Sequence, residues 1–239
     1  MSLEMSFYPT FRNQGQQLQN LLGDLPEGLK TLIGGADYAS PTGYLNSRVF
    51  YLLMPMILTI LASTLGGSLL AREESDGTLE QLLARPVSRG QVITAKFSAM
   101  VTILLIATSA ATGCIVLLAH VTNMAIADRV IVNTSLAAFG FALSIGSIAF
   151  VLTAAGTYAR SAAVAIASFI GLGGYVISSL AVQISWLAWP SRLFPFHYYQ
   201  PEVMLRGDAS LGSFLAPTLV CLVCFVCAHL TFRRRDLSS

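Results

Sequence analysis

The residues best suited to chemistry in this 239-residue chain are three cysteines and a histidine near its C-terminus. Cys221, Cys224 and Cys227, with His229 close behind, belong to the residue types that bind transition metals. On one α-helix, however, positions i, i+3 and i+6 cover an arc of about 120° and about 9 Å of axial rise, so we do not expect the three sulfurs to face one ion. We therefore interpret these cysteines as small packing residues and expect no metal site.

Other catalytic patterns are also missing from the sequence. His120 falls at the end of an apolar run, and His197 stands among aromatic residues. Four of the twelve acidic residues gather between Glu73 and Glu80, with no histidine or cysteine beside them to form a nucleophile–base pair. No G-x-x-x-x-G-K-[ST] loop occurs, so we expect this chain to bind no ATP or other cofactor itself and not to be an enzyme.

The elements that must position these residues are long and apolar. The chain is 54% hydrophobic and only 11% charged, whereas a soluble domain carries roughly 25% charged residues. A helix needs roughly 20 apolar residues to cross the hydrocarbon core. The sequence therefore predicts an all-α integral membrane protein with five visible transmembrane helices, near Val49–Ala71, Phe97–Ala119, Thr134–Ala155, Ser161–Val182 and Ser213–Phe232.

The charges that flank the spans predict their orientation. One set of connections holds Arg72, Arg85, Arg89, Lys96, Arg160 and Arg233–Arg235, whereas the other holds Arg48, Arg129, Arg192 and Arg206, with Arg12 and Lys30 further out. Because the first set is richer, it should be cytoplasmic, which places the C-terminus inside. A net charge of +2 with no basic run among aromatics argues against nucleic acid as a partner.

Residues 1–48 are expected to form an amphipathic segment on the outer surface, before a transmembrane domain at 49–239. Leucines repeat at helical spacing in this segment, and Ser40-Pro41 is typical of an N-cap and first turn. No apolar stretch precedes it to carry it across the membrane, so we expect one span to be missing from the front of the chain. Pro55, inside the first visible span, is expected to kink it.

The segment between the first two visible spans, 72–96, is the most informative part of the sequence. Seven of the eighteen residues from Arg72 to Arg89 are charged. Leu79, Leu82 and Leu83 share one side of a short predicted helix that Pro86 ends, and Ser88 with Gln91 forms a capping-box pattern. A helix resting on headgroups would favour Lys and Arg. The acidic residues here favour docking to a protein partner instead.

The string from Glu73 to Arg89 resembles the cytoplasmic signature of type-2 ABC transporter permeases, an exporter class. The likeness extends through Tyr8-Pro-Thr-Phe11, Leu25-Pro-Glu-Gly28, Thr42-Gly-Tyr-Leu-Asn46 and Pro195-Phe-His-Tyr-Tyr199. The resemblance implies six spans, of which the first is absent here, and a coupling helix that seats in a groove of a separate ATPase. The implied docking residues are Glu73, Glu74, Gly77, Thr78, Leu79, Glu80, Leu82, Leu83, Pro86 and Arg89.

The resemblance also implies a function. It predicts the permease subunit of an ATP-binding-cassette exporter in a prokaryotic cytoplasmic membrane, paired with a second permease copy, with ATP and Mg on the ATPase. The uncharged spans suit a lipophilic drug, an antibiotic or a lipid-like substrate. The alternative is an ion-coupled carrier or channel, which usually carries ionisable residues inside the membrane or inverted repeats. The sequence shows neither feature.

An aromatic outer loop at 184–212 leaves two interpretations open. Trp186 and Trp189 precede a dense aromatic run, which is typical of an interfacial belt. The family resemblance favours a re-entrant helix that lines the outer exit of a transport path. The candidate exit residues are Phe194, Pro195, Phe196, His197, Tyr198 and Tyr199.

Overall fold

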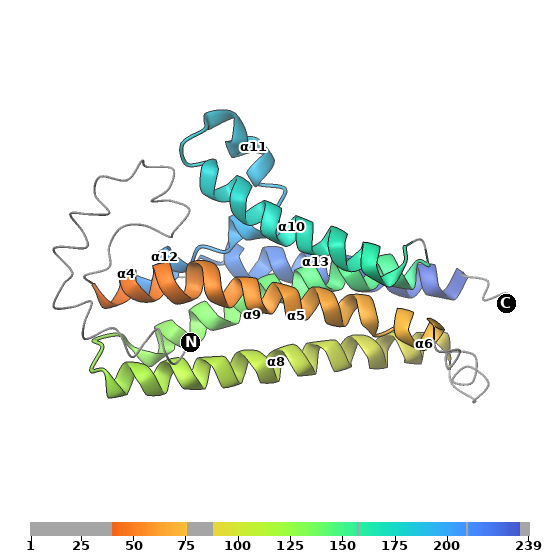
Figure 1. Ribbon diagram of the computed structural model, residues 1–239, viewed down its shortest axis with the longest axis horizontal. Coiled ribbons are helices and arrows are strands. Elements are labelled where there is room, and N and C mark those ends of the chain that lie inside the picture. The colour runs from red at the N-terminus through yellow and green to blue at the C-terminus, as the bar shows by residue number, and fades with distance from the viewer. Residues whose placement is uncertain (1–39, 76–87, 157, 209, 235–239) are drawn as a thin grey trace.

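The protein is a bundle of long antiparallel helices (Figure 1). The computed structural model describes residues 40–75, 88–156, 158–208 and 210–234, and these contain helices and turns but no strand. Five helices within these ranges are long and apolar enough to span a membrane: Thr42–Ser68, Arg89–Val121, Asp128–Ala154, Arg160–Leu180 and Gly212–Arg233. The predicted all-α membrane fold is thus confirmed.

The described elements are mostly helices of very different lengths. The first span combines three of them, an α-helical turn, a π-helical segment and a longer α-helix. In chain order they are α4 (Pro41–Leu45), η1 (Asn46–Leu53), α5 (Met54–Ser68), α6 (Ala71–Ser75), α8 (Arg89–Val121), α9 (Asp128–Ala154), α10 (Arg160–Leu180), η2 (Ser185–Leu187), α11 (Ala188–Ser191), η3 (Pro195–Tyr198), α12 (Pro201–Leu205) and α13 (Gly212–Arg234).

Side-chain caps decide where two of the spans begin. The Oγ atom of Ser40 accepts a hydrogen bond from the N–H of Gly43 at 3.0 Å, and Pro41 occupies the first turn, as predicted. At Ser88, the Oγ atom accepts from the N–H of Gln91 at 3.2 Å, while Gln91 Oε1 accepts from the N–H of Ser88 at 2.8 Å. This reciprocal pair is the predicted capping box.

The first three spans extend beyond the apolar runs that predicted them. The first helix starts at Pro41 rather than near residue 49, and α8 starts at Arg89 rather than near residue 97. Helical hydrogen bonding continues past the hydrocarbon boundary wherever a cap and suitable residues allow it. An apolar run therefore predicts the part of a helix that lies in the hydrocarbon core, and not the residues at which the helix begins and ends.

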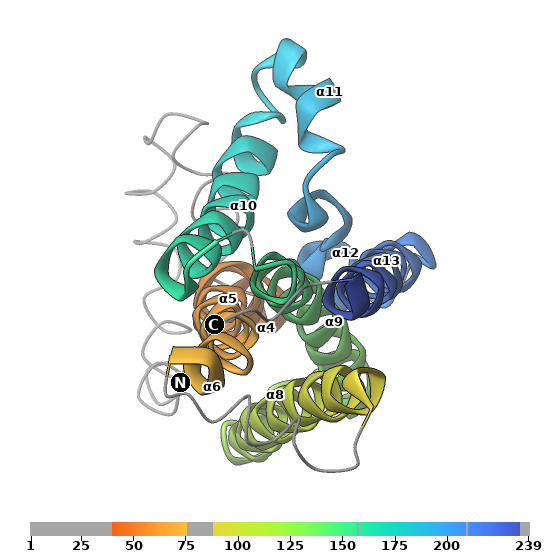
Figure 2. The same ribbon diagram turned by 90° about the vertical axis from the view of Figure 1, so that its right-hand side faces the viewer.

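Helix α9 forms the centre of the bundle. It packs against α5, α8, α10 and α13, and in Figure 2 it lies among these four helices. Its most apolar window is 61% buried, compared with 17% for α8 and for α13. Helices α8 and α13 therefore present most of their apolar surface outward, to lipid or to another chain.

Glycines let the backbones of α5 and α9 approach closely. A Cβ atom on Gly66 would lie 2.1 Å from the carbonyl oxygen of Gly146. A Cβ atom on Gly146 would in turn lie 3.0 Å from the carbonyl oxygen of Ala62. Because lipid supplies no hydrophobic drive for helix association, such close packing is a main source of cohesion. This contact makes α5 and α9 the tightest pair in the bundle.

The α10–α11 region stands apart from the other helices. Its outer part and α11 project away from the bundle in both Figure 1 and Figure 2. Trp186 and Trp189 in this projection are each 71% exposed. Exposed tryptophans at the end of a membrane helix suit the headgroup region of a bilayer.

Candidate functional site

The two candidate regions lie at opposite ends of the bundle. At one end, here called the Arg89 end, α5 and α13 finish and α8 begins; α6 also lies there. At the other, here called the Tyr199 end, α4 begins and the η3 and α12 turns pack against the first span. We describe the Arg89 end first.

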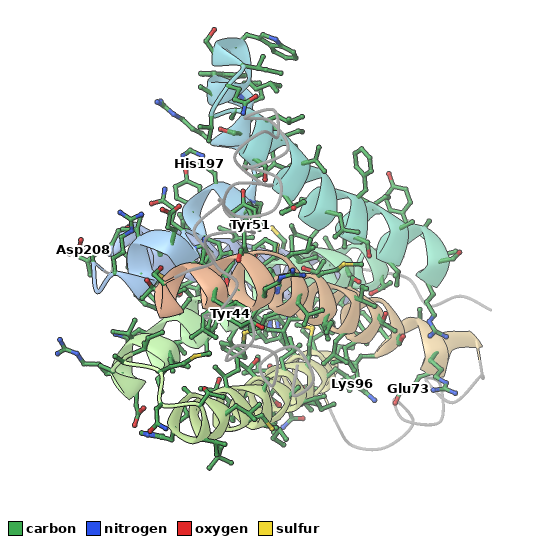
Figure 3. The ribbon with its side chains drawn as sticks, turned by 60° about the vertical axis from the view of Figure 1, so that its left-hand side comes forward. Tyr44, Tyr51, Glu73, Lys96, His197 and Asp208 are labelled. Atoms are coloured by element: carbon green, nitrogen blue, oxygen red, sulfur yellow. The ribbon has the colours of Figure 1, made fainter. Side chains whose placement is uncertain are left out.

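An ion pair joins two elements at the Arg89 end. Glu73 of α6 pairs with Nζ of Lys96 in the second turn of α8, as Figure 3 shows. The side chains are only 28% and 23% exposed, so water screens the pair less than it would screen an exposed one. This contact ties the helix that follows the first span to the start of the second.

Three of the predicted docking residues lie at this junction. Glu73 occupies α6, and Arg89 is the first residue of α8. Glu74 also belongs to α6. The other predicted docking residues lie outside the described residues: Gly77, Thr78, Leu79, Glu80, Leu82, Leu83 and Pro86. The structure therefore places the two ends of the segment, and the docking function stays a prediction.

At the Tyr199 end, an aromatic cluster surrounds Phe196. The ring of Phe196 is 4% exposed. It packs edge-on to Tyr51, Phe141 and Tyr175, with ring centroids 6.0, 5.5 and 5.2 Å away. Tyr199 lies 5.8 Å from Phe196 and stacks on Phe141. Residues three apart in a 3₁₀ turn share a face, which is why this pair points inward together.

The hydroxyl of Tyr199 completes the hydrogen bonding of the first span. In η1 the N–H of Met54 donates to the carbonyl of Val49, five residues earlier. In that register the Phe50 carbonyl would accept from residue 55, which is proline and has no N–H. The Tyr199 hydroxyl donates to this carbonyl at 2.7 Å instead. Pro55 is thus preceded by a π-helical segment, and a side-chain donor from outside the helix replaces the N–H group that proline lacks.

The remaining candidate exit residues are placed on both sides of the cluster. Phe194 lies against Gly174 of α10, where a Cβ atom would approach it to 2.9 Å, and Pro195 is buried at the start of η3. The rings of His197 and Tyr198 are more exposed and pack edge-on at 5.3 Å. The six predicted exit residues therefore divide into an inward-facing set and an outward-facing pair.

A cavity of about 480 Å³ opens beside this cluster, between α10 and the turns that follow it. His197 and Arg192 line it, with Glu202 from α12. Burial lowers the pKa of His197, and the nearby Arg192 guanidinium lowers it further, so the imidazole is held neutral. Such a surface, part aromatic and part polar, suits an amphipathic ligand.

Tyr51 is a site residue that sequence reasoning missed. Its hydroxyl lies 2.8 Å from the Oγ atom of Ser179, and its ring contacts both Tyr175 and Phe196. It lines the cavity as well. The sequence could have singled it out as a tyrosine inside an otherwise apolar span, because a buried tyrosine hydroxyl needs a hydrogen-bond partner.

The cysteines and histidines singled out in the sequence are dispersed. Cys221 is buried, Cys224 is partly buried and Cys227 is exposed, so the three face different surroundings of α13. His120 lies at the opposite end of the bundle from His229, and its Nε2 atom is 3.1 Å from the Asp128 carboxylate. Within the described residues, no three metal-ligating side chains come together.

Comparison with known families adds an independent observation. A family model described as "ABC-2 family transporter protein" matches residues 4–237, which is nearly the whole chain. The comparison with curated proteins gave no match. Permeases of the matched family are membrane transport components that work with ATP-binding subunits.

Proposed function

We propose that this chain, which belongs to the ABC-2 family of transporter proteins, is the permease subunit of an exporter that is driven by a separate ATPase. Its substrate would be lipophilic, such as a drug, an antibiotic or a lipid-like molecule. ATP and Mg would be held by the ATPase, and two permease copies would enclose the pathway. The membrane would be the cytoplasmic membrane of a prokaryote, with the C-terminus inside.

The observation that carries this proposal is the ion pair between Glu73 of α6 and Lys96 of α8. It joins the described residues on either side of the predicted docking segment, which links the first described span to the second in the sequence. A partner that moved this segment would act on α5, α6 and α8 together. The acidic residues of the segment favour a protein partner over a lipid surface.

A continuous set of contacts supports transmission from the Arg89 end to the Tyr199 end. Helix α5 is locked to α9 through the Gly66–Gly146 approach. It continues directly into η1, where Phe50 accepts the hydrogen bond from Tyr199. A displacement of α5 would therefore reach the aromatic cluster and the cavity beside it. In this proposal ATP binding closes the ATPase dimer, and the resulting movement opens the Tyr199 end to the outside.

Substitution of Leu82 tests the docking proposal. Leu82→Asp should abolish substrate-stimulated ATP hydrolysis by the assembled complex, because a carboxylate would occupy the apolar face predicted to seat in the ATPase. The measurement is ATP hydrolysis by the reconstituted complex, with and without substrate. Leu211→Asp is the matched control, because it adds the same charge at a side chain that is 78% exposed and far from the segment. An unchanged rate in the Leu82 variant would refute the proposal.

A further inference from the structure

A second cavity, of about 780 Å³, opens at the Arg89 end between the first turns of α8 and the last turns of α13. Of the residues that line it, only Arg89 belongs to the predicted docking set. The side chains and backbone that line it come from both helices. They are Ser88, Arg89, Gly90, Gln91, Thr94, Ala95, Ser98, His229 and Arg233.

The lining of this cavity is positively charged. Arg89 from α8 and Arg233 from α13 each contribute a guanidinium group, and no carboxylate is among the lining residues described. Glu73, an acid at the same end, pairs with Lys96. In the sequence Arg233 opens a run of three arginines. The charge of the cavity is therefore complementary to an anion.

Several donors are available to such an anion. The capping box uses only the Oε1 atom of Gln91, which leaves the amide N–H groups of that side chain for another acceptor. The Nδ1 atom of His229 is buried and has no hydrogen-bond partner in the described part of the chain. The guanidinium group of Arg233 adds bidentate donors of the geometry that phosphate oxygens match.

Glycine at position 90 shapes the wall of the cavity. A Cβ atom there would lie 2.7 Å from the Cε1 atom of the His229 ring. Any larger residue would push the imidazole away from α8. The ring of His229 also lies 6.3 Å from that of Phe225, which in turn packs against Phe97 at 4.9 Å. Polar groups thus give way to apolar ones within two turns along α13.

Exposed apolar residues lie on the cavity-lining faces of both helices. Leu105 on α8, seven residues beyond Ser98, is 47% exposed, and Leu222 and Val226 on α13, seven and three residues before His229, are 57% and 53% exposed. A soluble anion would use only the basic cavity. A ligand with a phosphate head and hydrocarbon tails would use both the cavity and these faces.

We propose that this cavity binds the phosphate headgroup of an anionic phospholipid, with the acyl chains lying along the exposed faces of α8 and α13. Basic pockets between membrane helices are a recurrent form of anionic lipid site. The proposal rests on the proposed function only for the assignment of this end to the cytoplasmic leaflet. The bound lipid would brace the start of α8, which follows directly on segment 73–89.

Native mass spectrometry of the purified full chain tests the proposal. The protein is released from nanodiscs that contain equal amounts of phosphatidylglycerol and phosphatidylcholine, and the retained lipids are counted. We expect selective retention of phosphatidylglycerol, reduced about fivefold by Arg233→Gln, since one basic group near a lipid surface contributes about a factor of five in binding. Arg233→Lys should keep part of the retention, because the charge remains.

Matched variants separate a built site from general attraction. Arg160→Gln removes an exposed charge at the same end of the bundle but outside the cavity, and should leave retention unchanged. Thr94→Glu should abolish retention by placing a carboxylate in the cavity, whereas Thr94→Val should not. The Thr94 hydroxyl donates to the Gly90 carbonyl, so its loss leaves the cavity charges intact. Thermal unfolding of each variant shows that it is folded.

Three results would overturn the proposal. Equal losses in the Arg160 and Arg233 variants would indicate non-specific attraction to the surface. Displacement of the lipid by millimolar inorganic phosphate would indicate a soluble anion site. Retention that appears only in chain purified without the ATPase, and is lost when the complex assembles, would indicate that an acidic protein surface occupies the cavity. Leu82→Asp should leave lipid retention unchanged, so failure of the docking proposal remains distinguishable.

Discussion

At the scale of single residues, the Tyr199 hydroxyl has the clearest physical role. It donates to the Phe50 carbonyl, which lacks a donor in the π-helical register because residue 55 is proline. The carbonyl lies in a membrane span, where no bulk water replaces a missing donor. Burial raises the pKa of the Tyr199 phenol, so the hydroxyl keeps its proton for this bond.

Replacement of Tyr199 should therefore destabilise the Tyr199 end of the bundle. Tyr199→Phe keeps the ring that stacks on Phe141 but leaves the carbonyl unpaired, which should cost about 1–3 kcal/mol. The measurement is the free energy of unfolding in detergent micelles. Tyr198→Phe is the matched control, since that ring is 36% exposed and its loss of a hydroxyl should change little.

A second substitution, Pro55→Ala, tests whether the missing hydrogen bond causes the loss of stability. In the Tyr199→Phe background, Pro55→Ala restores a backbone N–H near the Phe50 carbonyl. Part of the lost stability should return, because the carbonyl regains a donor. The hydrogen-bond explanation would be wrong if the effects of Tyr199→Phe and Pro55→Ala on the free energy of unfolding simply added up in the double variant.

At the scale of elements, the contact between α5 and α9 dominates. Interhelical hydrogen bonds accompany the glycine approach, since the Thr153 hydroxyl of α9 lies 3.4 Å from the Gly66 carbonyl. On its other side α5 meets α10, where the Oγ atoms of Ser63 and Ser168 are 3.0 Å apart. Helix α5 is thus held in contact with α9 on one side and α10 on the other, which suits a helix that is proposed to transmit a displacement from one end of the bundle to the other.

Gly66→Ala should separate these helices. The added methyl group would meet the backbone oxygen of Gly146 at 2.1 Å, and a backbone atom cannot rotate aside. Overpacking of this kind typically costs about 1–3 kcal/mol. Unfolding in detergent measures the cost, with Gly113→Ala as control, because a Cβ atom there meets nothing within 4 Å. Equal stability of the two variants would show that the approach is not needed.

At the scale of the whole molecule, apolar surface is distributed unevenly. The most apolar windows of α8 and α13 are each 17% buried, whereas that of α9 is 61% buried. The exposed faces are available to lipid and to the second permease copy that the proposed function requires. Basic residues gather at the Arg89 end, which is the predicted cytoplasmic side.

Thiol labelling tests this orientation. In a background without Cys114, Cys221, Cys224 and Cys227, a cysteine is introduced by Leu211→Cys or by Ser238→Cys. A membrane-impermeant maleimide should label the first variant in intact cells and the second only in inverted vesicles. The reasoning is the positive-inside rule, because Arg233–Arg235 lie a few residues before Ser238 in the sequence. The opposite labelling pattern would reverse the orientation.

The sequence by itself determined the features that depend on neighbouring residues. Apolar length predicted five spans, and hydroxyl and amide side chains at fixed offsets predicted the caps at Ser40 and Ser88. The signature from Glu73 to Arg89 identified the family to which the chain belongs. These are local signals, because a cap, a turn or a run of apolar residues is complete within a few positions of the chain.

The tertiary structure alone decided which distant side chains meet. The Tyr199 hydroxyl donates to a carbonyl 149 residues away, and Glu73 pairs with Lys96, 23 residues further along the chain. Arg233 and His229 share a cavity with Gly90 only because α13 returns beside α8. Such contacts depend on the rotation of each helix about its axis and on how closely glycines let the backbones approach. Neither can be predicted from a local sequence pattern.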